Sequence, residues 1–335
     1  MKKFFILLVV SLMGTTAAFA QSSLLATLNH EGTISTFYGA TALREAHSAA
    51  DHGDVITLSS GSFLSTGITK AITLRGAGMG IDSTMQTEPT IITGNITINI
   101  NDTVTKRLTM EGLYNNDYVR YSTSTLKNAM FLKCRFKEFS YDGSKPGKLK
   151  NVSFIHCRIA SRFSLYDDCS ASCINSVIGG PDVKSNTSSI FEFVNCFIYI
   201  SSYDYIYSSS FKNSIIYSYN VGLPSNATAY NCVGLNNALF DNITNSTNSM
   251  ANTSDIFKTY KGGYLGQLDN EKFELTDAAK EKYHSMDGTT EVGIYGGNLP
   301  FDPTPSNPQI TKCNVAAKST ADGKLSVDIQ VNSAE

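Results

Sequence analysis

A small residue recurs along the chain at a spacing that a repeating architecture explains. Gly, Cys or Ser stands at positions 76, 94, 112, 134, 157, 176, 196, 214 and 232, at intervals of 18 to 23 residues. A unit of this kind, repeated along a chain, is typical of a solenoid whose turns bury their apolar faces against one another. Flanking stretches such as FEFVNCFIYI alternate in twos, which predicts that the turns consist of strands.

The residues around each small position predict a corner. In NVSFIHCRIA, Phe154 stands three residues before Cys157, and Ile159 stands two residues after it. Because successive side chains of a strand point to opposite faces, Phe154 and Cys157 cannot both face the inside of one flat strand. We therefore expect two short strands that meet at a bend in every turn. The small residues would then stack in a column at the strand spacing of about 4.8 Å.

Three stretches resemble parts of known β-helix proteins. GDVITLSSGSF followed by KAITLRGAGMG is similar to the opening coils of the pectate-lyase-like right-handed parallel β-helix superfamily, and DGTTEVGIYGG resembles the last coil of secreted bacterial β-helix proteins. TALREAHSAAD resembles their N-terminal capping helix, with Thr41 as N-cap and Leu43, Ala46 and Ala50 on an apolar face. The resemblance runs from about residue 40 to residue 297. It implies an all-β right-handed parallel β-helix and assigns no activity.

The beginning of the chain predicts export. Lys2 and Lys3 precede an apolar run, and Ala18-Phe19-Ala20 supplies a small-residue cleavage signal, so residues 1–20 are identified as a signal peptide. No later apolar run approaches the roughly 18 residues that a membrane-spanning helix needs. We expect a secreted, periplasmic or cell-surface protein, with no membrane span, whose β-helix and N-terminal cap occupy residues 21–298.

The end of the chain predicts two further segments. Four of the eight prolines lie within PFDPTPSNP, so residues 299–308 are expected to form an extended linker. Residues 309–335 alternate between apolar and polar on either side of an ADG turn, which predicts a β-hairpin. Because two strands alone are marginally stable, we expect this hairpin to dock on the C-terminal end of the solenoid, with surface anchoring as the alternative.

Composition narrows the function classes. The net charge of −2 gives no basic excess of the kind that favours nucleic acid. Most of the seven cysteines fall in the small-residue column, where we expect buried thiols, while Cys169 and Cys173 are the better candidates for a disulfide. No His accompanies these two at a zinc spacing, so neither a metal nor another cofactor is expected.

The positions after the corner suggest a ligand surface. Arg135 and Arg158 follow the small residue on consecutive turns, with Lys133 and His156 beside them. Facing outward, these side chains would form a basic ridge able to meet uronate or sulfate groups.

An enzyme is one alternative for that surface. Enzymes of the resembled superfamily carry their chemistry on an outer sheet face, which makes a lyase or hydrolase of acidic polysaccharide an alternative, with Asp167 or Asp168 as its acid. A calcium cradle of several carboxylates is not visible in the sequence, so no catalytic residue is assigned.

A row of tyrosines suggests a sugar platform. Tyr199 and Tyr217 hold equivalent places on adjacent turns, and Tyr203 follows nearby. Exposed rings in a row can stack on sugar faces while their hydroxyls form hydrogen bonds. The alternative is the ordinary preference of tyrosine for half-exposed strands.

Later turns place apolar residues at the same outward position. Val177, Phe197, Ile215 and Val233 would form a continuous apolar stripe. Either a long loop of the chain covers this stripe or a protein partner does. The asparagines that precede the corners on these turns are interpreted as structural, since amides satisfy backbone groups at bends. They are Asn175, Asn195, Asn213 and Asn231.

These patterns favour a secreted or surface β-helix protein, without catalytic activity, that binds polysaccharide along its coil face. The predicted binding residues are Tyr199, Tyr217, Tyr203, Arg135, Arg158 and His156. The alternatives are the polysaccharide lyase or hydrolase and a structural or adhesive protein that contacts another protein through the apolar stripe.

Overall fold

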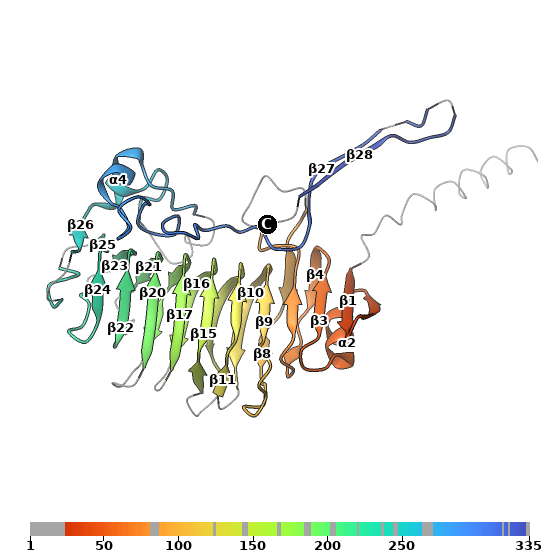
Figure 1. Cartoon of the computed structure of the whole chain (residues 1–335), viewed down its shortest axis with the longest axis horizontal. Coiled ribbons are helices and arrows are strands. Elements are labelled where there is room, and N and C mark those ends of the chain that lie inside the picture. Colours follow the sequence, from red (N-terminus) through yellow and green to blue (C-terminus); the bar gives the residue numbers. More distant parts are fainter. Residues whose placement is uncertain are drawn as a thin grey trace, which may run out of the picture.

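The computed structural model shows a parallel β-solenoid of about eight turns. It describes residues 24–80, 87–122, 125–142, 147–165, 169–183, 189–201, 206–219, 221–235, 238–243, 247–262, 271–316, 318–320 and 322–332. The predicted signal peptide lies outside the described residues. Figure 1 shows the strands stacked side by side along the long axis of the molecule, so the fold is the solenoid expected from the repeat.

Two long sheets form the walls of the solenoid. The first sheet has eleven strands, which are β2 (Thr33–Tyr38), β1 (Leu25–His30), β3 (Val55–Leu58), β6 (Thr73–Arg75), β9 (Thr109–Glu111), β12 (Met130–Leu132), β15 (Val152–Ile155), β17 (Ser170–Ile174), β20 (Ile190–Val194), β22 (Ser209–Lys212) and β24 (Thr228–Tyr230). The second sheet has thirteen, which are β26 (Ser249–Met250), β25 (Val233–Gly234), β23 (Ile215–Ser218), β21 (Phe197–Ile200), β18 (Val177–Gly179), β16 (Arg158–Leu165), β13 (Arg135–Tyr141), β10 (Leu113–Tyr121), β7 (Thr90–Thr93) and β4 (Gly61–Leu64), with β19 (Pro181–Val183), β8 (Ile96–Ile98) and β5 (Gly67–Ile68) beside them.

The remaining elements are short. They are the strand pairs β11 (Thr125–Lys127) with β14 (Lys148–Lys150) and β27 (Gln309–Val315) with β28 (Val327–Asn332), and the helices α2 (Ala42–Ala49), α3 (Thr253–Ile256) and α4 (Asp277–Lys282).

The corner predicted from the broken alternation is confirmed. β15 ends at Ile155 and β16 begins at Arg158 in the other sheet, with His156 between them in the left-handed conformation at φ 53°. Phe154, Cys157 and Ile159 are all fully buried. Phe154 stacks on Phe131 of the preceding turn, with ring centroids 4.8 Å apart.

The cysteines and serines of the column from Cys134 to Ser214 share one hydrogen-bonding pattern. The Cys157 thiol donates to the carbonyls of Ile155 and of Phe131 on the preceding turn. The Ser176 hydroxyl donates to Ile174 and Phe154, which are the equivalent positions one turn later. A buried group that can donate to both carbonyls is therefore what the corner selects.

Three expectations about small residues and cysteines are wrong. Gly112 aligns with Lys133 and not with Cys134, because Glu111 pairs with Leu132 and Tyr114 pairs with Arg135. Gly76 aligns with Gly112, so both glycines precede the column position by one residue. Gly94 lies between β7 and β8 within the second sheet, so the turn from Gly76 to Gly112 is one long coil and not two short ones. Cys169 and Cys173 are free and buried. Cys169 comes just before β17 and Cys173 lies within it, and residues four apart in an extended strand are about 13 Å apart, too far for a disulfide.

The N-terminal end of the solenoid is closed as predicted. α2 follows Thr41, and it packs Leu43, Ala46 and Ala50 into the core at exposures of 1% or less. β1 pairs antiparallel with both β2 and β3, so the parallel stack ends in a hairpin at this edge.

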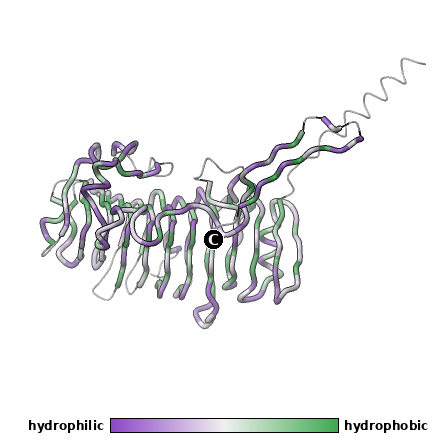
Figure 2. Tube along the Cα trace, turned by 45° about the horizontal axis from the view of Figure 1, so that its top comes forward, coloured by the Kyte–Doolittle hydropathy of each residue, from purple (hydrophilic) through white to green (hydrophobic). Residues whose placement is uncertain are grey.

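The chain after the last coil turns back along the solenoid. Residues 253–308, called the strap below and described at 253–262 and 271–308, run from the C-terminal turns toward the N-terminal ones, across the upper side in Figure 1. The expected docking of the hairpin on the C-terminal end is wrong, because Asn307 donates to the Gly76 carbonyl at 3.0 Å and Ile310 N donates to Thr87 Oγ1 at 2.9 Å. β27 and β28 then project away from the coils, with hydrophobic and hydrophilic residues interspersed along them (Figures 1 and 2).

We expect Cys157→Ser to change the free energy of unfolding by less than about 1 kcal/mol, because serine supplies the same donor at this corner. The matched change Ile159→Ser, two residues on and equally buried, should cost about 3–5 kcal/mol through lost burial and an added polar group. Urea unfolding followed by circular dichroism measures both. Equal losses in the two variants would contradict the assigned role of the column.

Candidate functional site

Arg135 and Arg158 lie side by side on consecutive turns, as predicted, but they do not form the expected outward-facing basic ridge. The strap covers Lys133, His156 and Arg158. Lys133 Nζ donates to Asp302 Oδ2 at 2.7 Å and to the Thr304 carbonyl. His156 Nε2 lies 3.1 Å from the Leu299 carbonyl. Residues 299–308, expected as a linker, therefore lie bonded to the coils.

Both arginines of the ridge are buried against aromatic rings. The Arg158 guanidinium carbon lies 5.4 Å from the ring centroid of Phe301 and 5.7 Å from that of Phe273, and the residue is 1% exposed. Arg135 lies 4.4 Å from the ring centroid of Tyr114 on the preceding turn and is also buried. These cation–π contacts in a site shielded from water stabilise the guanidinium groups, so neither side chain presents its charge to solvent.

A single column of left-handed residues bonds the strap to successive turns. Asn175 Nδ2 donates to the carbonyls of Ile294 and Gly296, both at 2.8 Å. The asparagines of the later turns also bond to the strap. Asn195 donates to the Gly296 carbonyl, Asn213 accepts from Met286 N, and Asn231 donates to the His284 carbonyl. The asparagines interpreted as structural thus hold a distant segment of the chain, and Lys133 and His156 continue the same column.

The predicted tyrosine platform is partly enclosed. Tyr199 and Tyr217 stack on each other, with centroids 5.1 Å apart and ring planes 11° apart. Tyr199 is buried, and Tyr260 of the strap stands edge-on to Tyr217 with centroids 6.4 Å apart. Tyr203 lies outside the described residues, as do Asp167 and Asp168. The pair is therefore parallel, as a sugar platform would be, but the strap packs against it.

The strap also covers the apolar stripe. Val177, Phe197, Ile215 and Val233 are 2% exposed or less. Phe273 stacks on Phe197 with centroids 4.1 Å apart, and a second apolar cluster forms between the stripe and the strap. The expected protein contact through these four residues is therefore wrong, because the chain's own strap already occupies them.

The strap is part of the fold and not a lid. Burial of each large apolar side chain contributes about 1.5–3 kcal/mol, and Ile256, Phe257, Phe273, Leu275 and Phe301 are all buried in this cluster. Lifting the strap would expose them together with the stripe. Sequence periodicity could not reveal this cover, because the strap itself has no repeat.

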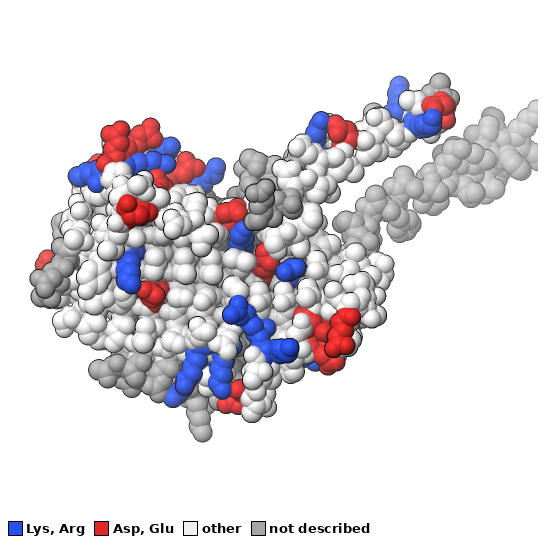
Figure 3. Space-filling model, viewed as in Figure 1, with Lys and Arg blue, Asp and Glu red and all other residues white. Residues whose placement is uncertain are grey.

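The C-terminal hairpin, unlike the stripe, leaves its large apolar side chains open to solvent. Its cross-strand pairs include Val315 with Val327 and Ile310 with Val331. Together with Ile329, these side chains are 38% to 56% exposed. In the view of Figure 3, charged side chains gather around α4 and along the hairpin, while most of the coil surface is uncharged.

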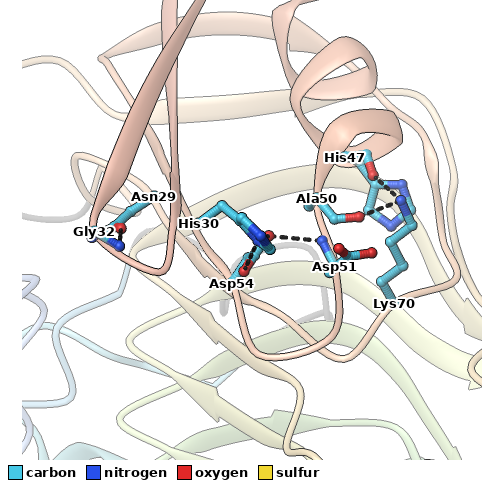
Figure 4. Close-up of polar contacts among 8 residues, drawn as sticks. All are labelled: Asn29, His30, Gly32, His47, Ala50, Asp51, Asp54 and Lys70. Carbon is cyan, nitrogen blue, oxygen red and sulfur yellow. Dashed lines mark hydrogen bonds and ion pairs between the residues drawn. The ribbon is translucent and has the colours of Figure 1, made fainter.

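A polar hollow of about 500 Å³ lies at the N-terminal end. His30 Nδ1 lies 3.0 Å from each carboxylate oxygen of Asp54, and Asp54 Oδ2 accepts from Asp51 N at 2.7 Å (Figure 4). This bond fixes the orientation of the exposed His30 ring and raises the pKa of His30, mainly through the Asp54 hydrogen bond. Sequence reasoning missed the pair because 24 residues separate the two.

On the other side of the cap, His47 anchors α2. Its Nε2 accepts from Thr69 N at 3.2 Å, and Lys70 Nζ donates to the Ser48 carbonyl. Figure 4 shows the bonds from Lys70 Nζ to the carbonyls of His47 and Ala50 at the end of the helix. Burial, together with the charge of Lys70, lowers the pKa of His47 to about 4. His47 therefore stays neutral at neutral pH and is a structural group.

Other chemistry is limited within the described residues. No group of three or more His, Cys, Asp or Glu in them is arranged to hold a metal ion. Burial raises the pKa of Cys157, Cys196 and Cys232 to about 12, so these thiols are unreactive. None of the helices described is long and apolar enough to cross a lipid bilayer.

Comparisons with protein-family models, with curated proteins and with solved structures find no match to this chain. The parallel β-solenoid is established by its strand pairing, and the pectate-lyase-like assignment stays a prediction.

We expect Asn175→Asp to loosen the strap. The change replaces the donor that serves two carbonyls with a carboxylate that repels them, at a cost of roughly 2–4 kcal/mol. Hydrogen exchange read by mass spectrometry should rise across residues 284–301 and stay unchanged in β9 and β12. Asn151→Asp is the matched control, since Asn151 is also left-handed but is exposed, and its amide donates to Asn128 Oδ1. Equal exchange in both variants would refute the strap's attachment through this column.

We expect acid to weaken the N-terminal cap through His47. The folded pKa of about 4 lies below the ordinary 6.5, so the contribution of neutral His47 is complete above pH 6.5 and is lost as pH falls toward 4. The loss amounts to at most about 3 kcal/mol. Thermal unfolding from pH 7 to pH 4 should show a steeper decline for the wild type than for His47→Gln, whose amide oxygen can accept from Thr69 without titrating. Parallel declines would exclude His47 as the cause.

Proposed function

We propose that this chain is an exported, non-catalytic β-helix protein, pectate-lyase-like in architecture, that serves as a rigid support and contacts another protein through its C-terminal hairpin. The observation that carries the proposal is the exposed apolar face of Ile310, Val315, Val327, Ile329 and Val331. Contiguous exposed apolar patches on soluble proteins mark interaction sites.

The state of the coil face also supports a contact role. Arg135, Arg158 and His156 are each at most 8% exposed. A lyase or hydrolase using them would have to displace the strap, whose aromatic side chains are buried with them. Export is supported by the signal-like residues 1–20, and the burial of the free thiols is compatible with an oxidising compartment.

Polysaccharide binding is the alternative function. Its specific support is the parallel stack of Tyr199 and Tyr217, in which Tyr217 keeps part of its surface open. Such a site would be small, because Tyr199 is buried.

The test is binding of the labelled mature chain, beginning at Gln21, to envelopes of the cells that produce it. We expect saturable binding that Ile329→Lys abolishes and Gln330→Lys retains, because the two changes add the same charge to successive residues of β28. Pretreatment of the envelopes with protease should remove binding.

The same preparations should be incubated with acidic and neutral polysaccharides, with and without calcium, while the absorbance of unsaturated products is followed. We expect no product and no competition for envelope binding. Product formation, competition by polysaccharide, or loss of binding in Tyr217→Ala with Ile329→Lys still binding would overturn the protein-contact proposal in favour of a glycan function.

A further inference from the structure

We propose that the partner of the hairpin is a second copy of the same hairpin, packed face to face to form a four-stranded, two-layer sandwich. This inference rests on the proposed function and names the occupant of its surface. The hairpin has one apolar face and one polar face.

One face of the hairpin is apolar and the other is polar. The register pairs Val315 with Val327 and Ile310 with Val331, while Lys312 is opposite Gln330 and Asn314 is opposite Asp328. Because side chains alternate along a strand, Val327, Ile329 and Val331 share one face and Asp328 and Gln330 share the other.

The charged residues of the two strands, Lys312 and Asp328, lie on the polar face, and the hairpin forms two internal ion pairs. Lys312 Nζ lies 2.6 Å from Asp328 Oδ2, and at the turn Lys324 Nζ lies 2.8 Å from Asp322 Oδ2. Two copies can therefore approach face to face without like charges meeting, which would otherwise disfavour a symmetric pair.

The five described side chains of this face carry no charge that a second copy would have to match with the opposite charge. Specific contacts between different proteins use complementary charged and polar groups to choose a partner. The described apolar side chains offer only a pleated, aliphatic surface, and a second sheet face packs on such a surface at a spacing of about 10 Å. A second copy supplies that face with the same length and twist, and a two-fold axis makes the contact self-complementary.

The attachment of the hairpin leaves this face accessible. Ser306 N donates to Glu111 Oε1 at 2.8 Å and Ile310 N donates to Thr87 Oγ1, so the base of the hairpin is held to the solenoid. From this base the strands project away from the coils (Figure 1). Two solenoids can thus meet at their hairpins without their bodies overlapping, and a two-stranded ribbon that is marginal alone gains a core.

The size of the face predicts a weak dimer. Five half-exposed aliphatic side chains per copy would bury about 800 Å² in total, below the roughly 1,200–2,000 Å² of stable complexes. We therefore expect a dissociation constant in the micromolar range or weaker.

Sedimentation equilibrium of the mature chain, at concentrations from about 1 to 300 μM, tests this inference. The weight-average mass should rise with concentration toward twice that of one chain. Ile329→Lys should hold it at one chain at every concentration, and Gln330→Lys should leave the wild-type rise unchanged. The far-ultraviolet circular dichroism of both variants checks that the solenoid is intact.

A wild-type chain that stays monomeric throughout, or an Ile329→Lys variant that associates like the wild type, would overturn the second-copy assignment. Monomeric wild type with envelope binding that still depends on Ile329 would leave the protein-contact function standing with a different partner. Loss of both would reject the proposed function as well.

Discussion

From β9 onward, each turn of this solenoid passes from the first sheet to the second through one residue in the left-handed conformation, and the rest of the structure depends on that constraint. For a residue other than glycine this conformation costs roughly 1–2 kcal/mol, least for Asn. Four of the corners use Asn, and the earlier ones use Gly112, Lys133 and His156. The same bend that turns the next small residue inward turns the side chain of the left-handed residue outward, where it meets the strap. The corner thus determines both the core column and the line along which the chain folds back.

The strap changes what the outer face can do. Arg135 and Arg158, as a sequence pattern, are typical of a surface that binds anions, but in the structure Arg158 is enclosed by Phe273 and Phe301, which lie more than a hundred residues later in the chain. A guanidinium group between aromatic rings stabilises a packing interface, and it no longer offers bidentate hydrogen bonds to a ligand. Val177 and Phe197 occupy the equivalent position on the next two turns, and the strap covers them as well. One strip of the coil surface therefore changes from basic to apolar residues, and all of it packs against the strap.

How far the sequence could predict this structure depends on the range of the interactions. The corner, the stacked phenylalanines and α2 follow from local periodicity and capping, so they were accessible. The repeat wrongly predicts a corner at Gly94, because one long coil contains a second small residue at the usual interval. The strap and the position of the hairpin depend on contacts such as Asn175 with Ile294 and Asn307 with Gly76, which join residues 119 and 231 positions apart. No spacing rule carries that information. The apolar stripe did predict that something covers it, but it could not say whether the cover was the chain itself.

The interchange of Cys and Ser at the corners shows that the thiols fill space and donate hydrogen bonds, and this affects how easily they can be oxidised. Cys196 donates to Cys173 and Val194 as Ser214 donates to Phe193 and Lys212, so the thiols are held as space-filling donors. Burial raises the pKa of Cys134, Cys173 and Cys196 well above that of an exposed thiol, which keeps the thiolate population negligible. Because disulfide exchange proceeds through the thiolate, these cysteines are protected from oxidation even in an oxidising compartment. The six described cysteines form no disulfide, so the described part of the chain takes its stability from the stacked core and from the strap that packs along it.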